Sequence, residues 1–369
     1  MEITKPSPSG LATPAATPTR MRHIPSLDGI RAISFMAVFL SHAGPRHMLI
    51  PGDFGVTTFF FLSGFLITTL MRSEFEKNGA INVQHFYLRR ALRILPPFYL
   101  VLLAAVLTAV VLYPPGTLYG PTLAAQALFV ANYEGIWGVN REIPGTGVVW
   151  SLAVEEHFYL LFPWLYIAMQ KWHLPRSGQA WLLWGLCAVT LLWRCVLVLA
   201  MHRSGARIYI ASDTRMDSIL FGCALAVWNN PALDAPTGPV RLWTYILIPA
   251  ALITLGVSFA YQGEVLTQTL GLSIQGVALT VLFIAAVRFH AWLPFRWLNL
   301  RPVAFVGVLS YSLYLVHQII LHAVARLWPQ WPAVSRAAIT LAASMIVAWV
   351  IYSVVERPCA RLRKRLMDQ

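Results

Sequence analysis

Arg31 and His42 are eleven residues apart in an otherwise apolar run, IRAISFMAVFLSH. In a helix, eleven residues make about three turns, which places both side chains on one face, ~16 Å apart along the axis. A guanidinium binds phosphate well, and an imidazole transfers protons near neutral pH. The pair therefore predicts a phosphate contact at one level and a general base deeper in the protein. The alternative is an interfacial arginine and a hydrogen-bonded histidine without catalytic function.

A second basic group occurs in the segment FYLRRALRILPP. Arg89 and Arg93 are four residues apart and share a helical face, with Arg90 beside them. Such a cluster binds a phosphorylated ligand or anionic lipid headgroups, and plain topology control is the competing interpretation.

Two carboxylates follow in the segment WSLAVEEHFYLLFP. Ser151, Glu155 and Tyr159 are spaced by four and share a helical face, whereas Glu156 points about 100° away. One carboxylate would orient and charge-stabilise the His42 imidazole. Alternatively, both are stabilised by the dipole at the start of their helix.

The segment GDFGVTTFFFLSGFLI contains Ser63 and Gly64. Small residues allow another backbone or a ligand to approach closely, and Ser63 adds a hydroxyl to an apolar surface. Helix packing is the favoured interpretation here, with oxyanion stabilisation by Ser63 as the functional alternative.

Further polar residues occur in two later apolar segments. Arg215 and Asp217 are inward-facing candidates, and a structural pair is the alternative interpretation. Tyr311 and Tyr314 are inward-facing candidates, and His317 is interpreted as a hydrogen-bonded histidine of the helix bundle and not as a second base.

The elements that position these residues follow from composition, because 57% of the 369 residues are hydrophobic and only 12% are charged. Apolar runs near the ~20 residues that cross a bilayer recur along the chain and predict an all-α bundle. We expect about ten spans, at 30–48, 54–72, 94–113, 148–169, 180–201, 215–229, 242–261, 266–287, 303–327 and 333–355. The segment 121–132 is too short to cross and predicts a surface or re-entrant helix.

The net charge of +13 reflects topology better than nucleic-acid binding, because most Lys and Arg residues flank the apolar runs. Their distribution favours both termini in the cytoplasm. We expect a disordered tail at 1–23, one transmembrane domain at 24–358 and a basic cytoplasmic tail at 359–369. The four cysteines lack CxxC spacing and predict no metal site.

Taken in order, these segments resemble the acyltransferase-3 family of bacterial membrane O-acyltransferases. The resemblance covers residues 24–358, through SLDGIRAISFMAVFLSH, FGVTTFFFLSGFLI, FYLRRALRILPPFY, WSLAVEEHFYLLFP, TRMDSILFGCALA, LSYSLYLVHQ and VERP. It differs at His157, where Gln is common in the family, and by carrying no C-terminal soluble hydrolase-like domain.

The resemblance implies an enzyme of the bacterial inner membrane that moves an acyl group, preferably acetyl, from cytoplasmic acyl-CoA to a hydroxyl of a carbohydrate or glycolipid acceptor. In residue terms it implies donor binding at Arg31, Arg89, Arg90, Arg93 and Ser63, and catalysis by His42 with Glu155 or Glu156. No metal and no nucleic acid are expected. Direct transfer, an acyl-histidine intermediate and a homo-oligomer all remain open.

The competing function class is a transporter or flippase for an envelope precursor, since buried ionisable groups also line translocation paths. The sequence lacks Gly/Pro-broken helices at corresponding positions of two halves, and this favours the enzyme.

Overall fold

The computed structural model describes residues 25–44, 50–134, 136–137, 141–203, 205–236, 238–261 and 263–367. These residues form helices and loops and contain no strand, so the predicted all-α class is confirmed for them. The predicted tail at 1–23 lies outside the described residues.

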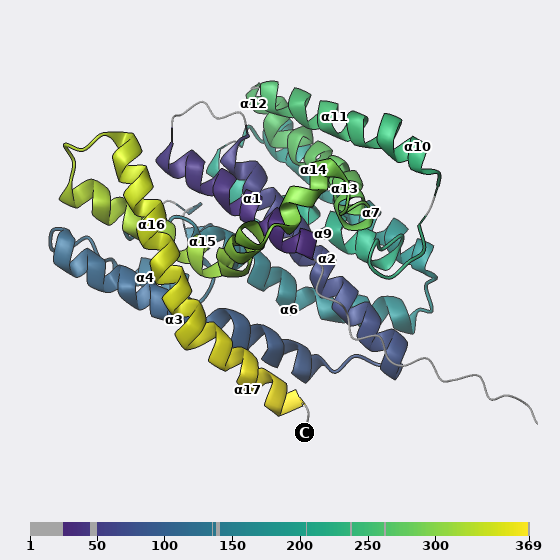
Figure 1. Ribbon diagram of the computed structural model, residues 1–369, viewed down its shortest axis with the longest axis horizontal. Helices are drawn as coiled ribbons and strands as arrows, with labels where there is room; N and C mark the ends of the chain where they lie inside the picture. The colour runs from purple at the N-terminus through teal and green to yellow at the C-terminus, as the bar shows by residue number, and fades with distance from the viewer. Residues whose placement is uncertain are drawn as a thin grey trace, which may run out of the picture.

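Each of the ten predicted spans falls on a long helix of the bundle (Figure 1). The long helices are α1 (Pro25–Ala43), α2 (Gly52–Asn78), α3 (Val83–Leu112), α6 (Val149–Lys171), α7 (Arg176–Cys195), α9 (Ser212–Val227), α11 (Ile248–Ala260), α13 (Leu272–Arg288), α15 (Arg301–Leu327) and α16 (Ala333–Ile351). The shorter helices are α4 (Gly120–Ala127), α5 (Ala131–Glu134), α8 (Ala206–Ile210), α10 (Val240–Leu242), α12 (Glu264–Leu266), α14 (Leu293–Arg296) and α17 (Arg357–Met367). The predicted short helix at 121–132 thus corresponds to α4 and the start of α5.

Single π-helical turns extend several of these helices. They lie at Val196–Ala200 after α7, Trp243–Leu247 before α11, Thr267–Gly271 before α13 and Tyr352–Glu356 between α16 and α17. A 3₁₀ turn at Trp297–Asn299 leads into α15.

Seven helical stretches among the described residues are long and apolar enough to cross a membrane. They are Gly52–Asn78, Val83–Leu112, Arg176–Ala200, Val240–Ala260, Glu264–Arg288, Arg301–Leu327 and Ala333–Met367. The chain is therefore a multi-pass membrane protein in its architecture. The other three predicted spans correspond to α1, α6 and α9.

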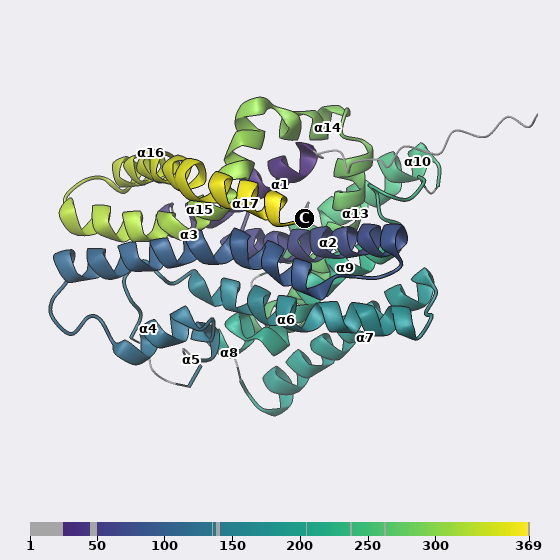
Figure 2. The ribbon, with the colours of Figure 1, turned by 90° about the horizontal axis from the view of Figure 1, so that it is seen from below.

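The centre of the bundle is formed by α1, α2, α9 and α15, which lie side by side in Figures 1 and 2. At the crossing of α2 and α9, a Cβ added to Gly64 would lie 2.0 Å from the Ile219 carbonyl oxygen, and one added to Gly222 would lie 2.0 Å from that of Phe61. No side chain fits at either position, so the two backbones are in direct contact. This bears out the packing interpretation of Gly64.

Helix α3 begins with a local signal and carries two prolines in its interior. The Asn82 side chain accepts a hydrogen bond from the backbone N–H of His85 at 2.9 Å, a standard N-cap. Pro96 and Pro97 follow directly after the basic cluster and remove two backbone donors there. The hydroxyl of Tyr311 on α15 donates to the nearby Ile94 carbonyl at 2.9 Å, which ties the two helices together at this point.

The C-terminal segment continues α16 as a helix. Helix α17 packs against α3 and crosses it in Figure 1, which brings a basic, amphipathic helix to the end of the bundle where α1 and α15 begin.

Candidate functional site

A pocket opens between α1, α2, α3, α6 and α15, and we call it the arginine pocket. It contains about 780 Å³ of empty space, open solvent included. Its lining combines three arginines, one carboxylate, six hydroxyls and apolar side chains: Arg31, Val56, Phe59, Phe60, Leu62, Ser63, Leu66, Arg90, Arg93, Ile94, Ser151, Leu152, Glu155, Tyr159, Ser310, Tyr311 and Tyr314.

The three arginines come from two helices. Arg31 of α1 donates to the Asp28 carboxylate at 2.7 Å, which fixes its guanidinium at the start of the helix. Arg90 lies over the Tyr159 ring, 5.0 Å from the ring centroid, a cation–π contact. Arg93 follows Arg90 by three residues and faces the same pocket. With Glu155 as the one carboxylate in the lining, the pocket attracts anions.

Arg89 does not belong to this group. The sequence places Arg89 on the face of Arg93 at a spacing of four, but of the three arginines of α3 only Arg90 and Arg93 line the pocket. Arg89 instead donates to the Glu74 carboxylate of α2 at 2.8 Å. The predicted triplet is therefore corrected: Arg90 and Arg93, joined by Arg31, line the pocket, and Arg89 forms an ion pair outside it.

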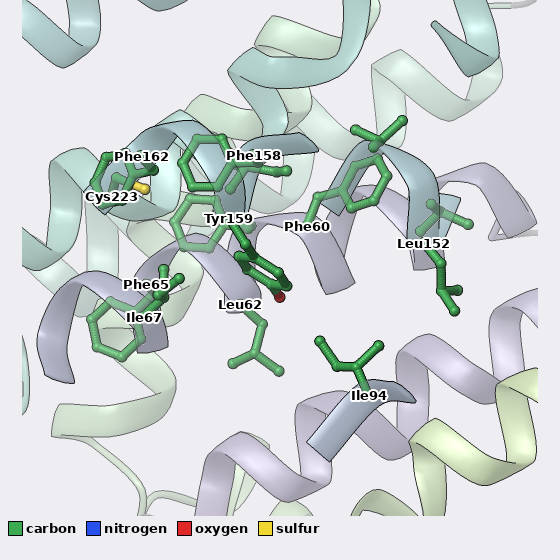
Figure 3. Packing of buried hydrophobic residues seen from close by; sticks show 14 of the residues in the cluster. Phe60, Leu62, Phe65, Ile67, Ile94, Leu152, Phe158, Tyr159, Phe162 and Cys223 are labelled. Atoms are coloured by element: carbon green, nitrogen blue, oxygen red, sulfur yellow. The ribbon is translucent and has the colours of Figure 1, made fainter. Parts of the chain in front are cut away.

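A polar chain crosses the arginine pocket from α2 to α6. The Tyr159 hydroxyl donates to Glu155 at 3.1 Å and forms a second, short hydrogen bond with the Ser63 hydroxyl. Figure 3 shows the Tyr159 ring among Phe60, Leu62, Ile94 and Leu152, with its hydroxyl facing the space between them. The predicted common face of Ser151, Glu155 and Tyr159 is confirmed, because all three line the pocket and Glu156 does not.

A second pocket lies where α1, α3 and α15 end and α16 begins, and we call it the histidine pocket. It contains about 910 Å³ of empty space, open solvent included. It is lined by His42, Ala43, Tyr113, Leu321, His322, Ala325, Arg326, Ala333 and Arg336, and so shares no lining residue with the arginine pocket.

His42 is held at both ring nitrogens. Its Nδ1 lies 3.0 Å from Nε2 of His317, and its Nε2 lies 3.1 Å from the side-chain nitrogen of Gln318. The two imidazoles are stacked, with ring centroids 5.2 Å apart.

The backbone contacts of His317 fix the direction of these hydrogen bonds. His317 Nδ1 lies 2.9 Å from the Tyr314 carbonyl oxygen and 3.2 Å from that of Leu313. Carbonyls only accept, so this nitrogen carries the hydrogen. His317 is fully buried and stays neutral, so its Nε2 accepts from His42 Nδ1. His42 Nε2 is then left with a lone pair, to which the Gln318 amide donates, and this is the state in which an imidazole acts as a base.

This arrangement corrects the sequence-based partner of His42. Glu155 or Glu156 was expected to orient the imidazole, but both ring nitrogens contact α15 residues, and Glu155 bonds to Tyr159. The Oε1 atom of Glu156 is buried without a hydrogen bond among the described residues. His317, expected to be a hydrogen-bonded bundle histidine, is that and also the direct neighbour of His42.

Helix α15 sets the order of the two pockets. Ser310, Tyr311 and Tyr314 line the arginine pocket, His317 follows one turn later, and Leu321 begins the lining of the histidine pocket after another turn. The Tyr314 ring contacts Phe59 and His317 at centroid distances of 5.8 and 5.9 Å. The rings of Phe59, Tyr314 and His317 therefore form a layer between the pockets, and His42 contacts this layer from the side of the histidine pocket.

The alternative interpretation of Arg215 and Asp217 as a structural pair is wrong. Asp217 is paired with Arg194 of α7 at 2.7 Å, and both side chains are fully buried. The Arg215 guanidinium instead lies over the rings of Phe60, Trp150 and Tyr209, and donates to the Thr57 hydroxyl at 3.1 Å. Arg215 and Asp217 are two residues apart and so point to different sides of α9.

The sequence interpretation missed the residues that surround His42 on its open side: Gln318, His322, Arg326, Arg336 and the nearby Glu142. The charged ones among them lie near helix ends or in a loop, where charged residues are ordinary, and Gln318 is an uncharged residue within α15. The spacing of His317, Leu321 and His322 indicates that they lie on consecutive turns of one helix. This points to a site at His42 only once His42 is known to contact that helix.

Comparison with known proteins agrees with this architecture. At 28% identity over 91% of this chain, it is similar to the peptidoglycan O-acetyltransferase OatA of Listeria monocytogenes, of which it covers 56%. At 30% identity over 80% of this chain, it is similar to the O-acetyltransferase OatA of Staphylococcus aureus NCTC 8325, of which it covers 50%. The chain thus spans about half the length of these relatives.

No solved structure gives a significant match to this chain. A family model described as an acyltransferase domain matches residues 24–353, nearly the whole length. The chain therefore belongs to the acyltransferase-3 family.

Proposed function

We propose that this chain is a membrane O-acyltransferase that moves an acyl group, with acetyl as the first choice, from acyl-CoA to a hydroxyl of an envelope glycan or glycolipid. The observation that carries the proposal is the pair of pockets on either side of the His42–His317 contact. The activity for which the relatives are named, O-acetylation, supports the same reaction class.

The arginine pocket is the proposed donor site. Coenzyme A carries phosphates at one end and a thioester at the other, and Arg31, Arg90 and Arg93 offer guanidinium forks for the phosphates. Apolar and hydroxyl side chains line the rest of the pocket up to Tyr314, the direction in which the pantetheine arm would run. Ser63 and Tyr159 lie along this path, and either is suited to bind the thioester carbonyl.

His42 is the proposed general base. Its Nε2 takes the proton of the acceptor hydroxyl while the hydroxyl oxygen attacks the thioester carbonyl. The C–S bond then breaks, the thiolate leaves, and the imidazolium returns the proton to sulfur, which yields an O-acyl ester and free coenzyme A. The neutral His317 orients the imidazole in the place that a carboxylate holds in hydrolase triads.

The proposal requires the donor's reactive end to pass the ring layer at Phe59, Tyr314 and His317. Aromatic side chains can swing aside when a ligand supplies the contacts that they lose. Donor binding in the arginine pocket would therefore join the two pockets for the duration of the reaction.

The proposed topology has ten spans, with α1, α6 and α9 crossing along with the seven apolar helices, in the inner membrane of a bacterium. Both termini lie in the cytoplasm, so the arginine pocket faces the cytoplasmic acyl-CoA and the histidine pocket faces the opposite side. The basic residues before α1, at the end of α2, in the first turns of α3 and on α17 support this orientation.

Donor consumption tests the proposal. Purified full-length protein in lipid nanodiscs is given [acetyl-¹⁴C]acetyl-CoA and crude envelope glycan, and free coenzyme A thiol and base-labile label are measured. We expect both to rise together and to be lost in His42→Ala. Movement of a substrate across vesicles without thiol release would favour the transporter class instead.

A further inference from the structure

We propose that the histidine pocket binds an acceptor that itself carries an anionic group, a carboxylate or a phosphate, near the hydroxyl to be acylated. This inference rests on the proposed function and narrows its substrate class. It is carried by two arginines and two histidines around one cavity whose lining contains no carboxylate.

Arg336 is the clearest element of this pocket. It lies in the first turn of α16, and its guanidinium has no hydrogen-bond or ion-pair partner among the described residues. A guanidinium offers five donors in a fixed fork that fits a carboxylate or phosphate in two-point contact. Because Arg336 also lines the cavity that His42 lines, an anion bound here is part of a ligand that reaches the base.

Arg326 is preorganised for the same purpose. Its Nε donates to the Leu112 carbonyl oxygen at 3.3 Å, and its guanidinium lies over the Tyr113 ring at 5.8 Å. These contacts fix the aliphatic part of the Arg326 side chain and one face of its guanidinium. The two terminal nitrogens have no partner among the residues that the structure describes, so a ligand can use them.

The neighbouring acidic residue does not cancel this charge. Glu142 lies close to His322 and beside Gln318, because a Cβ on Gly147 would be 2.5 Å from Glu142 Oε1 and 3.0 Å from Gln318 Oε1. It is not part of the pocket lining. One carboxylate at the edge therefore faces two arginines, and the pocket retains an excess of positive charge for an anion.

The positions of the arginines and of His42 indicate where the anionic group and the hydroxyl of such a ligand would bind. Its anionic group contacts Arg336 and Arg326, and its hydroxyl displaces the Gln318 amide from His42 Nε2. Two-point binding of this kind holds the hydroxyl in position for proton transfer, which a neutral acceptor would achieve less well. Arg326 and Arg336 are thus specificity-determining residues for the acceptor.

The first test measures the charge of the acetylated acceptor and does not require the acceptor to be identified. Membranes containing the wild-type chain are pulsed with [acetyl-¹⁴C]acetyl-CoA, and the labelled acceptor is passed over an anion exchanger at pH 7. We expect it to be retained, and a label that elutes as a neutral species overturns the proposal. Butanol extraction then separates an acidic glycolipid from a water-soluble acidic glycan. Either acceptor carries an anionic group, so either result supports the proposal.

The second test uses variants of the pocket. Arg336→Gln is expected to lower the initial rate of label transfer about tenfold, the effect of one lost charge-assisted hydrogen bond, and to leave acetyl-CoA binding unchanged. Arg336→Lys should recover part of the rate, because it keeps the charge. Arg203→Gln removes an exposed positive charge outside both pockets and is the matched control.

The outcomes separate the two proposals. If wild-type protein releases no thiol from acetyl-CoA, the proposed function fails. If it transfers label but Arg336→Gln and Arg326→Gln both transfer at the wild-type rate, only this inference fails, and the arginines serve phospholipid headgroups.

Discussion

The arginine pocket and the histidine pocket differ in how their charges are held. In the arginine pocket most polar groups are tied to one another: Arg31 to Asp28, Arg90 to the Tyr159 ring, and Tyr159 to Glu155. In the histidine pocket Arg336 has no partner among the described residues and Arg326 keeps its terminal nitrogens free. The first pocket is prebuilt inside a helix bundle, and the second is an open site at helix ends.

This difference indicates two kinds of ligand. A prebuilt, apolar-walled pocket with arginines at one end suits a long, flexible molecule with a phosphorylated head, whose ordering cost is reduced by a fixed site. An open pocket with free cations suits part of a larger molecule that extends beyond the protein. The His42–His317 contact between them is where the two ligands would meet.

The largest expected effect comes from removing the base. His42→Ala should lower acyl transfer by about 10²–10⁴-fold, the usual contribution of general base catalysis, because it removes the imidazole that takes the proton of the acceptor hydroxyl. Transfer is measured as base-labile label from acetyl-CoA, and equilibrium binding of acetyl-CoA should stay at the wild-type value. The exposed His202, changed to Asn, serves as control; an active His42→Ala protein would remove His42 from the chemistry.

The next effect separates orientation from chemistry. His317→Ala frees His42 Nδ1 from its fixed partner, so the imidazole loses its defined tautomer and direction. We expect kcat to fall by about 10²-fold, with KM for acetyl-CoA unchanged and an altered pH profile. A purely structural role would lower the amount of folded protein and leave the pH profile of the remaining enzyme as in wild type.

A third set of variants tests the donor pocket against its surroundings. Arg93→Gln and Arg90→Gln should weaken acetyl-CoA binding by about 10- to 100-fold, because each removes a charged donor to phosphate. Arg89→Gln should change it much less, since Arg89 is paired with Glu74 outside the pocket. Equal losses at Arg89 and Arg93 in equilibrium binding would contradict this assignment.

A smaller effect is expected at the edge of the histidine pocket. A Cβ at position 147 would lie 2.5 Å from Glu142 Oε1 and 3.0 Å from Gln318 Oε1, both at the ends of flexible side chains. Gly147→Ala should therefore fold, shift Gln318 away from His42, and change transfer a few-fold without affecting donor binding. Donor affinity that falls in parallel with transfer would show that the two pockets are not independent.

The smallest effect on either pocket is expected from Asp234, in the loop after α9. Burial raises the pKa of this carboxyl, but hydrogen bonds from Arg72 and the Asn230 backbone outweigh it and leave the pKa below its usual value. The stabilisation is complete above pH 3.8 and is lost as the pH falls through the lower folded pKa. Asp234→Asn should cost about 1–3 kcal/mol at neutral pH, seen as a lower melting temperature, with both ligand affinities unchanged.

The sequence predicts the helices and the interior of the site well for one physical reason. A charge at membrane depth is costly, so Arg31, His42, Glu155 and Arg90 stand out against apolar neighbours. Helical spacing then assigns their faces, as it does for Ser151, Glu155 and Tyr159.

Partners across helices are harder to predict. Spacing within α3 cannot tell that Arg90 and not Arg89 faces the pocket, because this depends on how the whole helix is rotated against α2. The pairing of Asp217 with Arg194 and the contact of His42 with His317 likewise join segments far apart in the chain. Charged residues at helix ends, such as Arg336, carry no local signal at all.

The central claim is that donor and acceptor occupy different pockets that meet at His42. A cryo-electron microscopy structure of the protein in nanodiscs, with a non-hydrolysable thioether analogue of acetyl-CoA, tests it most directly. The account predicts phosphate density beside Arg90 and Arg93 and the acyl end at Tyr314, facing the His42–His317 pair. Nucleotide density in the histidine pocket, or an acyl end directed away from His42, would contradict it.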